Sequence, residues 1–270
     1  MPELPEVEFA VRIVRRAVTG RTITSATVLH PSQRRALPDE AARSLVGDRI
    51  GAVDRRGKHQ LLRLTSGRTL HVHFRMTGDW RAIPAPSAQT LVQPVTGHPR
   101  FELSFDDGSR LVLDDPRALS AVVLYDAGVD PLPSLGPEAT DPAFNATTLA
   151  HAVGKRRIPI KVALLDQAVV AGIGNIYASE ALWRARLDPR VEAGRLTQAQ
   201  RQRLVVGVRQ TMDKALRDPG RYYGAAADDP RRFNVYDREG LACRRCRAKI
   251  RRLTQAGRST YFCPSCQKKR

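Results

Sequence analysis

Residues 171–176 read Ala-Gly-Ile-Gly-Asn-Ile and stand between two segments with helical periodicity, residues 159–168 and 176–184. The stretch is not a dinucleotide fingerprint, because Tyr177 takes the place of a third glycine and no strand precedes it. A glycine-containing turn that opens a helix presents backbone N–H groups to an anion, and Asn175 can add a side-chain donor. In a basic protein the simplest anion is a DNA phosphate, although a plain tight turn between two helices explains the stretch equally well by itself.

The chain on either side divides into a strand-rich first part and a helical second part. An amphipathic helix is expected over residues 3–19, followed by β-like runs at residues 21–29, 49–55, 59–65, 69–76, 101–105 and 110–113. Asp107-Gly108 predicts a hairpin turn, and residues 81–99, rich in Pro, Ala and Gln, are interpreted as a loop. Residues 131–142 hold four prolines and mark a boundary, beyond which helices are expected at residues 143–153, 159–168, 176–184 and 197–217.

This pattern predicts an α+β multidomain fold. Many short strands at close spacing are typical of a sandwich or barrel, here an N-terminal β-sandwich with a leading helix over residues 1–134. A helical domain is expected over residues 141–224, and a β-hairpin zinc finger over residues 232–270.

The finger is predicted from two Cys-x-x-Cys pairs separated by sixteen residues. This spacing lets two knuckles offer four thiolates to one tetrahedral Zn²⁺. Four sulfur ligands leave no open position, so the ion would be structural and would not carry the chemistry. Two disulfides or four unpaired thiols are the alternative. The predicted ligands are Cys243, Cys246, Cys263 and Cys266.

The charge of the chain points to a polyanionic partner. Lys and Arg number 45 against 27 Asp and Glu, a formal charge of +18. Thirteen of the cations but only two acids fall between Arg231 and Arg270, in the segment with the cysteines, which argues against a basic tail or a mere solubility device. No apolar run is long enough to span a membrane, and the N-terminus does not resemble a signal peptide. With few cysteines as well, a cytoplasmic protein is expected.

The chain begins Met1-Pro2, a sequence from which the initiator methionine is normally removed. Removal would expose a secondary amine at Pro2, and α-amino groups have a lower pKa than lysine. A neutral amine can attack an aldehyde-level carbon to form an iminium, with Glu3 beside it to donate or accept protons. Proline at position 2 is common, so these two residues alone are weak evidence.

Three stretches together resemble the formamidopyrimidine-DNA glycosylase and endonuclease VIII family, and its formamidopyrimidine branch more closely. Residues 1–8 (Met-Pro-Glu-Leu-Pro-Glu-Val-Glu) resemble its N-terminus, residues 166–180 its helix–two-turn–helix element, and residues 257–267 its zinc finger. The matches lie in the family's order and span the chain. The resemblance implies a bifunctional glycosylase and AP lyase of base excision repair, acting on damaged double-stranded DNA.

The resemblance also assigns roles to single residues. It implies that Pro2 attacks C1′ of the damaged nucleotide, that Glu3 handles protons, and that Lys58 contacts phosphate and assists elimination. It implies a phosphate grip for Arg258 and Asn175, and a gap-filling role for Met76. Phosphate contacts fix register without reading sequence, and an apolar wedge stabilises an opened duplex. Further DNA contacts are implied for His98, Arg117 and Arg156.

Two departures from the family pattern concern the lesion. Residues 115–120 read Asp-Pro-Arg-Ala-Leu-Ser, so Leu119 replaces an aromatic wedge and Ala118 replaces an arginine. Residues 218–230 are shorter than the branch's Gly- and Thr/Ser-rich lesion-capping loop and lack its signature. These departures suggest the hypothesis that 8-oxoguanine is not the best substrate. Oxidised pyrimidines, formamidopyrimidines, abasic sites or a bulkier adduct then become more plausible.

Competing interpretations remain at this level. A non-catalytic damage-binding protein could use the same scaffold, although the presence of Pro2, Glu3 and Lys58 argues against it. A zinc-ribbon transcription or replication factor is disfavoured by the N-terminal motif. If Met1 stays on the mature protein, Pro2 is acylated and cannot attack. We expect a bacterial, nucleoid-associated protein that acts as a monomer.

Overall fold

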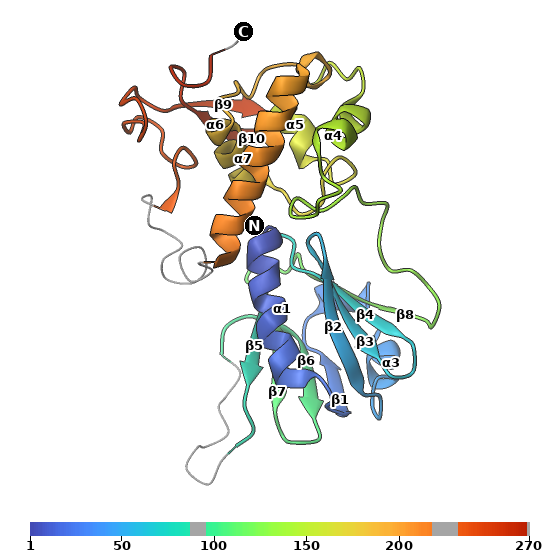
Figure 1. The fold of residues 1–270 in the computed structure, drawn as a ribbon. Coiled ribbons are helices and arrows are strands. Elements are labelled where there is room, and N and C mark those ends of the chain that lie inside the picture. The colour runs from blue at the N-terminus through green and yellow to red at the C-terminus, as the bar shows by residue number, and fades with distance from the viewer. Residues whose placement is uncertain (87–95, 218–231, 269–270) are drawn as a thin grey trace. The chain divides into compact units, whose positions relative to one another are not determined.

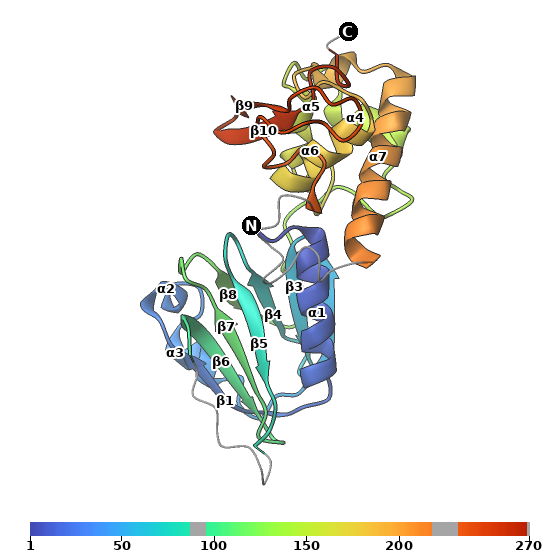
Figure 2. The ribbon, with the colours of Figure 1, turned by 90° about the vertical axis from the view of Figure 1, so that its left-hand side faces the viewer.

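The computed structural model describes residues 1–86, 96–217 and 232–268. The chain forms two compact units, one of Met1–Pro2 and Glu6–Pro133 and the other of Glu3–Pro5 and Ser134–Arg270. Figures 1 and 2 show a first unit built mostly of strands and a second built mostly of helices. No helix among the described residues combines the length and the apolar character needed to cross a membrane.

The first unit is a β-sandwich that follows a leading helix, α1 (Leu4–Val18), as predicted. One antiparallel sheet has the order β1-β6-β7-β5 and the other β2-β3-β4-β8. Apolar residues of α1 and of both sheets form one buried core. The strands are β1 (Ile23–Val28), β2 (Ile50–Arg56), β3 (His59–Leu64), β4 (Thr69–His73), β5 (Asp79–Ile83), β6 (Pro99–Phe105), β7 (Arg110–Asp114) and β8 (Ala121–Tyr125).

Most strand predictions are confirmed, including the hairpin between β6 and β7. The loop predicted over residues 81–99 is wrong at both ends, because residues 81–83 belong to β5 and Pro99 begins β6. In β5 only Trp80 is buried, so five residues gave too little alternation to be recognised. The strand predicted to reach Met76 ends at His73, because the chain turns at Arg75 (φ 57°). The helices α2 (Pro31–Arg34) and α3 (Asp39–Arg43) were not predicted.

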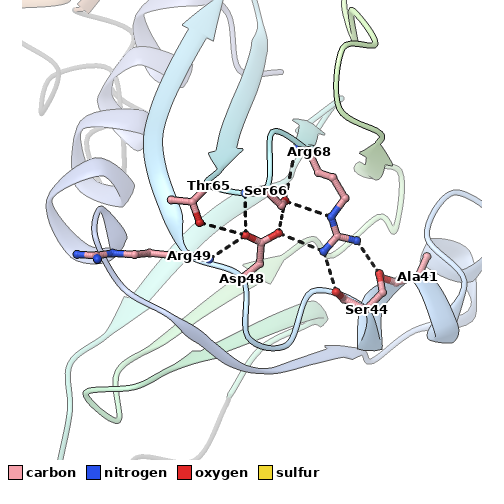
Figure 3. Close-up of polar contacts among 7 residues, drawn as sticks. All are labelled: Ala41, Ser44, Asp48, Arg49, Thr65, Ser66 and Arg68. Atoms are coloured by element: carbon pink, nitrogen blue, oxygen red, sulfur yellow. Dashed lines mark hydrogen bonds and ion pairs between the residues drawn. The ribbon is translucent and has the colours of Figure 1, made fainter.

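A buried carboxylate fixes the edge of the sandwich near α3 (Figure 3). Asp48 accepts hydrogen bonds from the backbone of Arg49 (3.0 Å) and Ser66 (3.3 Å), and from the hydroxyls of Ser66 (2.5 Å) and Thr65 (3.4 Å). Arg68 adds an ion pair of 3.1 Å and also donates to Ser44 O (2.8 Å), which follows α3. Burial opposes ionisation, but the bonds from Ser66 and Arg68 hold the pKa of Asp48 below its usual range.

The second unit packs α4 (Ala146–Val153), α5 (Ile160–Leu165), α6 (Asn175–Arg184) and α7 (Gln198–Arg217) around its own core. These four helices confirm the four helices predicted for this part of the chain. Helix α4 begins three residues later than predicted, because the Asn145 side chain caps it by accepting from Thr147 N and Thr148 N. At Gly207 of α7 a Cβ would lie 2.8 Å from Ala181 O, so only glycine lets α6 and α7 approach this closely.

The β-hairpin of β9 (Arg251–Gln255) and β10 (Arg258–Phe262) completes the second unit. The segment that leads to it is tied to α6 by Glu180, a buried side chain. Its carboxylate accepts from Asn234 N (2.9 Å), Val235 N (2.8 Å) and Tyr236 N (3.1 Å). A short 3₁₀ helix, Ala193–Arg195, lies between α6 and α7.

Candidate functional site

The buried carboxylate of Glu3 binds the N-terminus of α6. It accepts from Gly174 N (2.5 Å) and Ile176 N (2.8 Å), with Tyr177 N at 3.4 Å. The first N–H groups of a helix lack partners within the helix and carry partial positive charge, so they stabilise an anion. The residue next to Pro2 is therefore held in one place as an acceptor within the second unit.

Both glycines of the 171–176 turn are required by this arrangement. A Cβ on Gly174 would lie 2.5 Å from Glu3 Cδ, and one on Gly172 would lie 2.5 Å from Leu4 Cδ1. Gly172 also has φ +94°, a backbone conformation that side chains disfavour. The expectation that a DNA phosphate is the anion at these N–H groups is wrong, because Glu3 occupies the ones at Gly174, Ile176 and Tyr177.

Asn175 joins this turn to the zinc-finger hairpin. Its Nδ2 donates to Ser259 O at 3.0 Å, beside Arg258, and its Oδ1 accepts from Lys161 Nζ. Arg258 begins β10 and is exposed to solvent. Asn175 thus holds the hairpin through the residue that follows Arg258, while its predicted phosphate contact stays a prediction.

Lys161 is a residue that the sequence reasoning missed. Its side chain is fully buried, and Nζ also donates to Thr260 Oγ1 (2.9 Å) and Ser259 O (3.2 Å). Burial and, to a lesser extent, the nearby Arg258 lower its pKa to about 8, although Glu3 opposes the shift. One signal existed: a single lysine stands among the apolar residues of α5, where a cation needs a partner.

In the first unit Lys58 lies in the turn between β2 and β3 and is buried. Three histidines follow on one face of β3 and β4: His59 Nδ1 lies 2.8 Å from His71 Nε2, and the His59 ring meets the His73 ring edge-on at 4.9 Å. Burial, helped by the neighbouring cations Arg75 and Lys58, lowers the pKa of His59 to about 4, and that of His73 to about 3. Burial and Arg75 likewise lower the pKa of His71 to about 4.

These values predict a specific acid sensitivity. Because the folded rings resist protonation, their stabilising effect is complete above the unfolded pKa of 6.5 and is lost as pH falls towards about 4. We expect the Tm of the wild type to fall more between pH 7 and pH 4.5 than that of a His59→Phe/His71→Phe double variant. The difference should be several degrees, since ~1 kcal/mol is worth ~2–4 °C in a protein of this size. Parallel Tm curves would contradict the prediction.

The other predicted contacts of the first unit gather around Asp114 and Asp115. His98 N donates to Asp114 Oδ1 (2.5 Å), and Arg117 N to Asp115 Oδ1 (3.2 Å). Leu119 and Met76 lie at the tips of two loops, and each loop donates a hydrogen bond to Asp115. Sequence reasoning did not single out Asp115, although its Asp-Pro-x-x-x-Ser context is typical of a side chain that bonds to its own loop.

Arg156 is not joined to the Glu3–Asn175–Arg258 group by any contact that the structure records. It is exposed and pairs with Asp166 at 2.9 Å, ahead of the glycine turn. A surface pair of this kind is weak. Its predicted DNA contact stays a prediction.

The four cysteine Sγ atoms lie within 4.8 Å of one another. Cys246 Sγ is 3.4 Å from Cys263 Sγ, and Cys243 Sγ is 4.0 Å from Cys266 Sγ. Tetrahedral zinc with bonds of about 2.3 Å places its sulfurs about 3.8 Å apart, so this donor set fits one Zn²⁺. The prediction of one structural zinc is confirmed. The ion fixes the hairpin that carries Arg258.

Comparison with known proteins covers nearly the whole chain. Residues 1–122 match the model of the formamidopyrimidine-DNA glycosylase N-terminal domain, residues 135–223 that of its H2TH domain, and residues 240–269 the zinc finger found in FPG and IleRS. A formamidopyrimidine-DNA glycosylase of Chloroflexus aurantiacus is 40% identical over 277 residues, covering 99% of this chain and 98% of the relative. The chain belongs to the formamidopyrimidine-DNA glycosylase family. The resemblance seen in the sequence is thereby confirmed, as is the enzyme class at the level of the family.

Further members of the family agree with this assignment. A relative of the same name from Thioalkalivibrio sulfidiphilus is 40% identical, covering 99% of this chain and all of the relative. A complex of a Lactococcus lactis FPG mutant with a Fapy-dG containing DNA has a TM-score of 0.89 and 30% identity, covering 99% of this chain and all of that one. MutM in complex with DNA containing carbocyclic 8-oxo-G also reaches a TM-score of 0.89 at 30% identity, with the same coverage.

Family membership bears on the hypothesis of a divergent substrate. Relatives that match this chain from end to end are named formamidopyrimidine-DNA glycosylase, and nothing in the comparisons supports the exclusion of 8-oxoguanine. The shortened capping loop, residues 218–230, lies outside the described residues. Leu119 is the departure that the structure does describe.

Proposed function

We propose that this chain is a bifunctional DNA glycosylase and AP lyase that uses Pro2 as its nucleophile on damaged double-stranded DNA. The observation that carries the proposal is the burial of Glu3, the neighbour of Pro2, with its carboxylate held at the N-terminus of α6. Three N–H groups fix this carboxylate in one position and orientation beside Pro2, so it can take up or return a proton at a defined place. A protein that only bound damage would have no need for such a carboxylate beside a reactive amine.

The proposed reaction follows from the chemistry of a secondary amine. The Pro2 nitrogen forms a bond to C1′ as the bond from C1′ to the damaged base breaks, and the base leaves with a proton. Ring opening gives an iminium, whose charge makes the C2′ proton acidic. Loss of that proton expels the 3′ phosphate by β-elimination, and water then hydrolyses the iminium. Glu3 would carry protons in these steps, while Lys58 and Arg258 would bind the flanking phosphates.

The substrate class is proposed from the family. Relatives named for formamidopyrimidines favour such ring-opened purines as the first lesion to test. Leu119 remains the reason to test 8-oxoguanine separately, since leucine can fill a gap but stacks less well than phenylalanine. We propose that one chain suffices for binding, so the protein would act as a monomer.

Borohydride trapping tests the proposal. The protein, shown by mass spectrometry to lack Met1, is mixed with duplexes carrying an abasic site, formamidopyrimidine, 8-oxoguanine, thymine glycol, dihydrouracil or a bulky alkyl adduct. Reduction fixes the iminium as a covalent protein–DNA band. We expect a band on abasic and formamidopyrimidine duplexes. Absence of any band, with duplex binding retained, would favour the non-catalytic damage-binding alternative. Excision of 8-oxoguanine opposite cytosine as fast as formamidopyrimidine would remove the remaining case for a divergent substrate.

A further inference from the structure

Two loops of the first unit each carry an exposed apolar side chain at the tip. Met76, 36% exposed, lies in the turn of residues 74–78, and Leu119, 44% exposed, lies in the loop of residues 115–120. We call these the Met76 turn and the Leu119 loop. The residue before each tip has a left-handed backbone, Arg75 at φ 57° and Ala118 at φ 53°. Such a conformation is costly for residues with a side chain and persists only where the surroundings impose it.

One buried carboxylate bonds to both loops. Asp115 is fully buried, and its Oδ2 accepts from Leu119 N and Ser120 N, each at 2.7 Å. Its Oδ1 accepts from Arg117 N and from the hydroxyl of Thr77, the residue after Met76. Burial opposes ionisation, but the bonds from Thr77, Ser120 and Leu119 hold the pKa of Asp115 below its usual range. The side chain is thus an anion shared between the two loops.

The loops also touch directly and are anchored at their far ends. A Cβ on Gly78 of the Met76 turn would lie 3.1 Å from Ser120 Cβ, so the backbone of the Met76 turn lies against the Ser120 side chain there. His73 Nδ1 accepts from Arg75 N at 2.9 Å, and Gln33 Nε2 donates to Ser120 O at 2.6 Å. The two tips therefore share the Asp115 carboxylate as a common acceptor.

We propose that Asp115 is a positioning residue that couples the Met76 turn to the Leu119 loop, so that both apolar tips enter a damaged duplex as one unit. The inference rests on the proposed function, because it takes Met76 and Leu119 as the residues that fill the gap left by an everted base. Asp115 itself touches no substrate in this proposal. By holding both loops, it makes the two side chains insert together although they lie on separate loops.

A double-mutant cycle tests the coupling. Excision rates on a lesion duplex are measured for Met76→Ala, Leu119→Ala and the double variant, first with Asp115 and then with Asp115→Asn. Asparagine keeps the shape but replaces one acceptor oxygen by a donor, which cannot serve the N–H groups that face it. With Asp115 present, we expect the fold-reductions of the two single variants to multiply to at least about five times the fold-reduction of the double variant. In the Asp115→Asn background the losses should multiply.

Matched controls separate coupling from general damage to the fold. Asp48→Asn disrupts a carboxylate in the same unit that is also buried and serves five donors, but far from either tip in the chain (Figure 3). In the Asp48→Asn background, the double-mutant cycle of Met76 and Leu119 should show the same coupling as in the wild type. Thr77→Val removes only the hydroxyl donor and replaces Asp115→Asn if the latter does not fold. Trapping on a single-stranded abasic oligonucleotide, which has no stack to open, should change at most about threefold in Asp115→Asn.

Each outcome decides the matter. Multiplying losses with Asp115 present, or coupling that survives both Asp115→Asn and Thr77→Val, would overturn the inference. Loss of coupling in Asp48→Asn as well would reduce Asp115 to a part of the fold's general stability. If the parent protein gives no band even on single-stranded abasic DNA, the proposed function has failed, and that failure is distinguishable from a failure of coupling.

Discussion

Replacing Pro2 by glycine should reduce borohydride trapping on an abasic duplex by at least about 100-fold, since misplacing a reacting group by about 1 Å costs that much. Glycine keeps an α-amine, so the variant tests the ring and its fixed geometry rather than the mere presence of nitrogen. The proline nitrogen is secondary and gives an iminium whose positive charge needs no proton. That charge drives loss of the C2′ proton, so strand cleavage should fall with trapping. The measurement is the yield of covalent band against time at pH 7.

Pro5→Gly is the matched control, because it makes the same change three residues later in the first turn of α1. It should leave trapping within about threefold of the wild type, since the nucleophile stays in place. Protein that retains Met1 provides the complementary test, because its Pro2 nitrogen is an amide. Mass spectrometry identifies that form. Trapping at the wild-type level by both Pro2→Gly and the Met1-retaining protein would show that another amine forms the iminium.

Much of the architecture was predictable because it is encoded locally. The strands with clear alternation, the four helices and the cysteine spacing are each determined by residues close in sequence. The strands β5 and β8 were missed because five residues with only partial burial carry little periodic signal. Helices α2 and α3, of four and five residues, are too short to show a period.

The site was less predictable, because its contacts join distant parts of the chain. Glu3 was identified through family resemblance, but no local pattern shows that its carboxylate reaches Gly174, 171 residues away. The N–H groups of the glycine turn were correctly recognised as anion donors, and the wrong anion was assigned. Lys161 and Asp115 were missed because contacts with distant parts of the chain contribute to their roles. Lys161 donates to Thr260 on β10, and Asp115 accepts from Thr77 on another loop as well as from N–H groups of its own loop.

Glu3→Gln should lower base excision by at least about 100-fold, the lower end of what a positioned acid or base contributes. Glutamine is close in shape, but it cannot carry a proton from the substrate, and its NH₂ group would oppose one of the N–H groups of Gly174 and Ile176. That mismatch should also cost about 1–3 kcal/mol of stability. Trapping on preformed abasic DNA should fall less than base excision, because no base has to leave. The measurements are single-turnover excision, trapping and Tm on one preparation.

Glu180→Gln separates the chemical effect from the structural one. Glu180 is a second buried glutamate, within the helix α6 whose N-terminus Glu3 binds, and it accepts from three consecutive backbone N–H groups at residues 234–236. Its replacement therefore repeats the mismatch without altering a residue beside the nucleophile. We expect the two variants to lose similar stability, while Glu180→Gln keeps excision within a few-fold of the wild type. If both instead lost activity in proportion to stability, Glu3 would be a helix cap alone, and the protons of the reaction would have to move through another group.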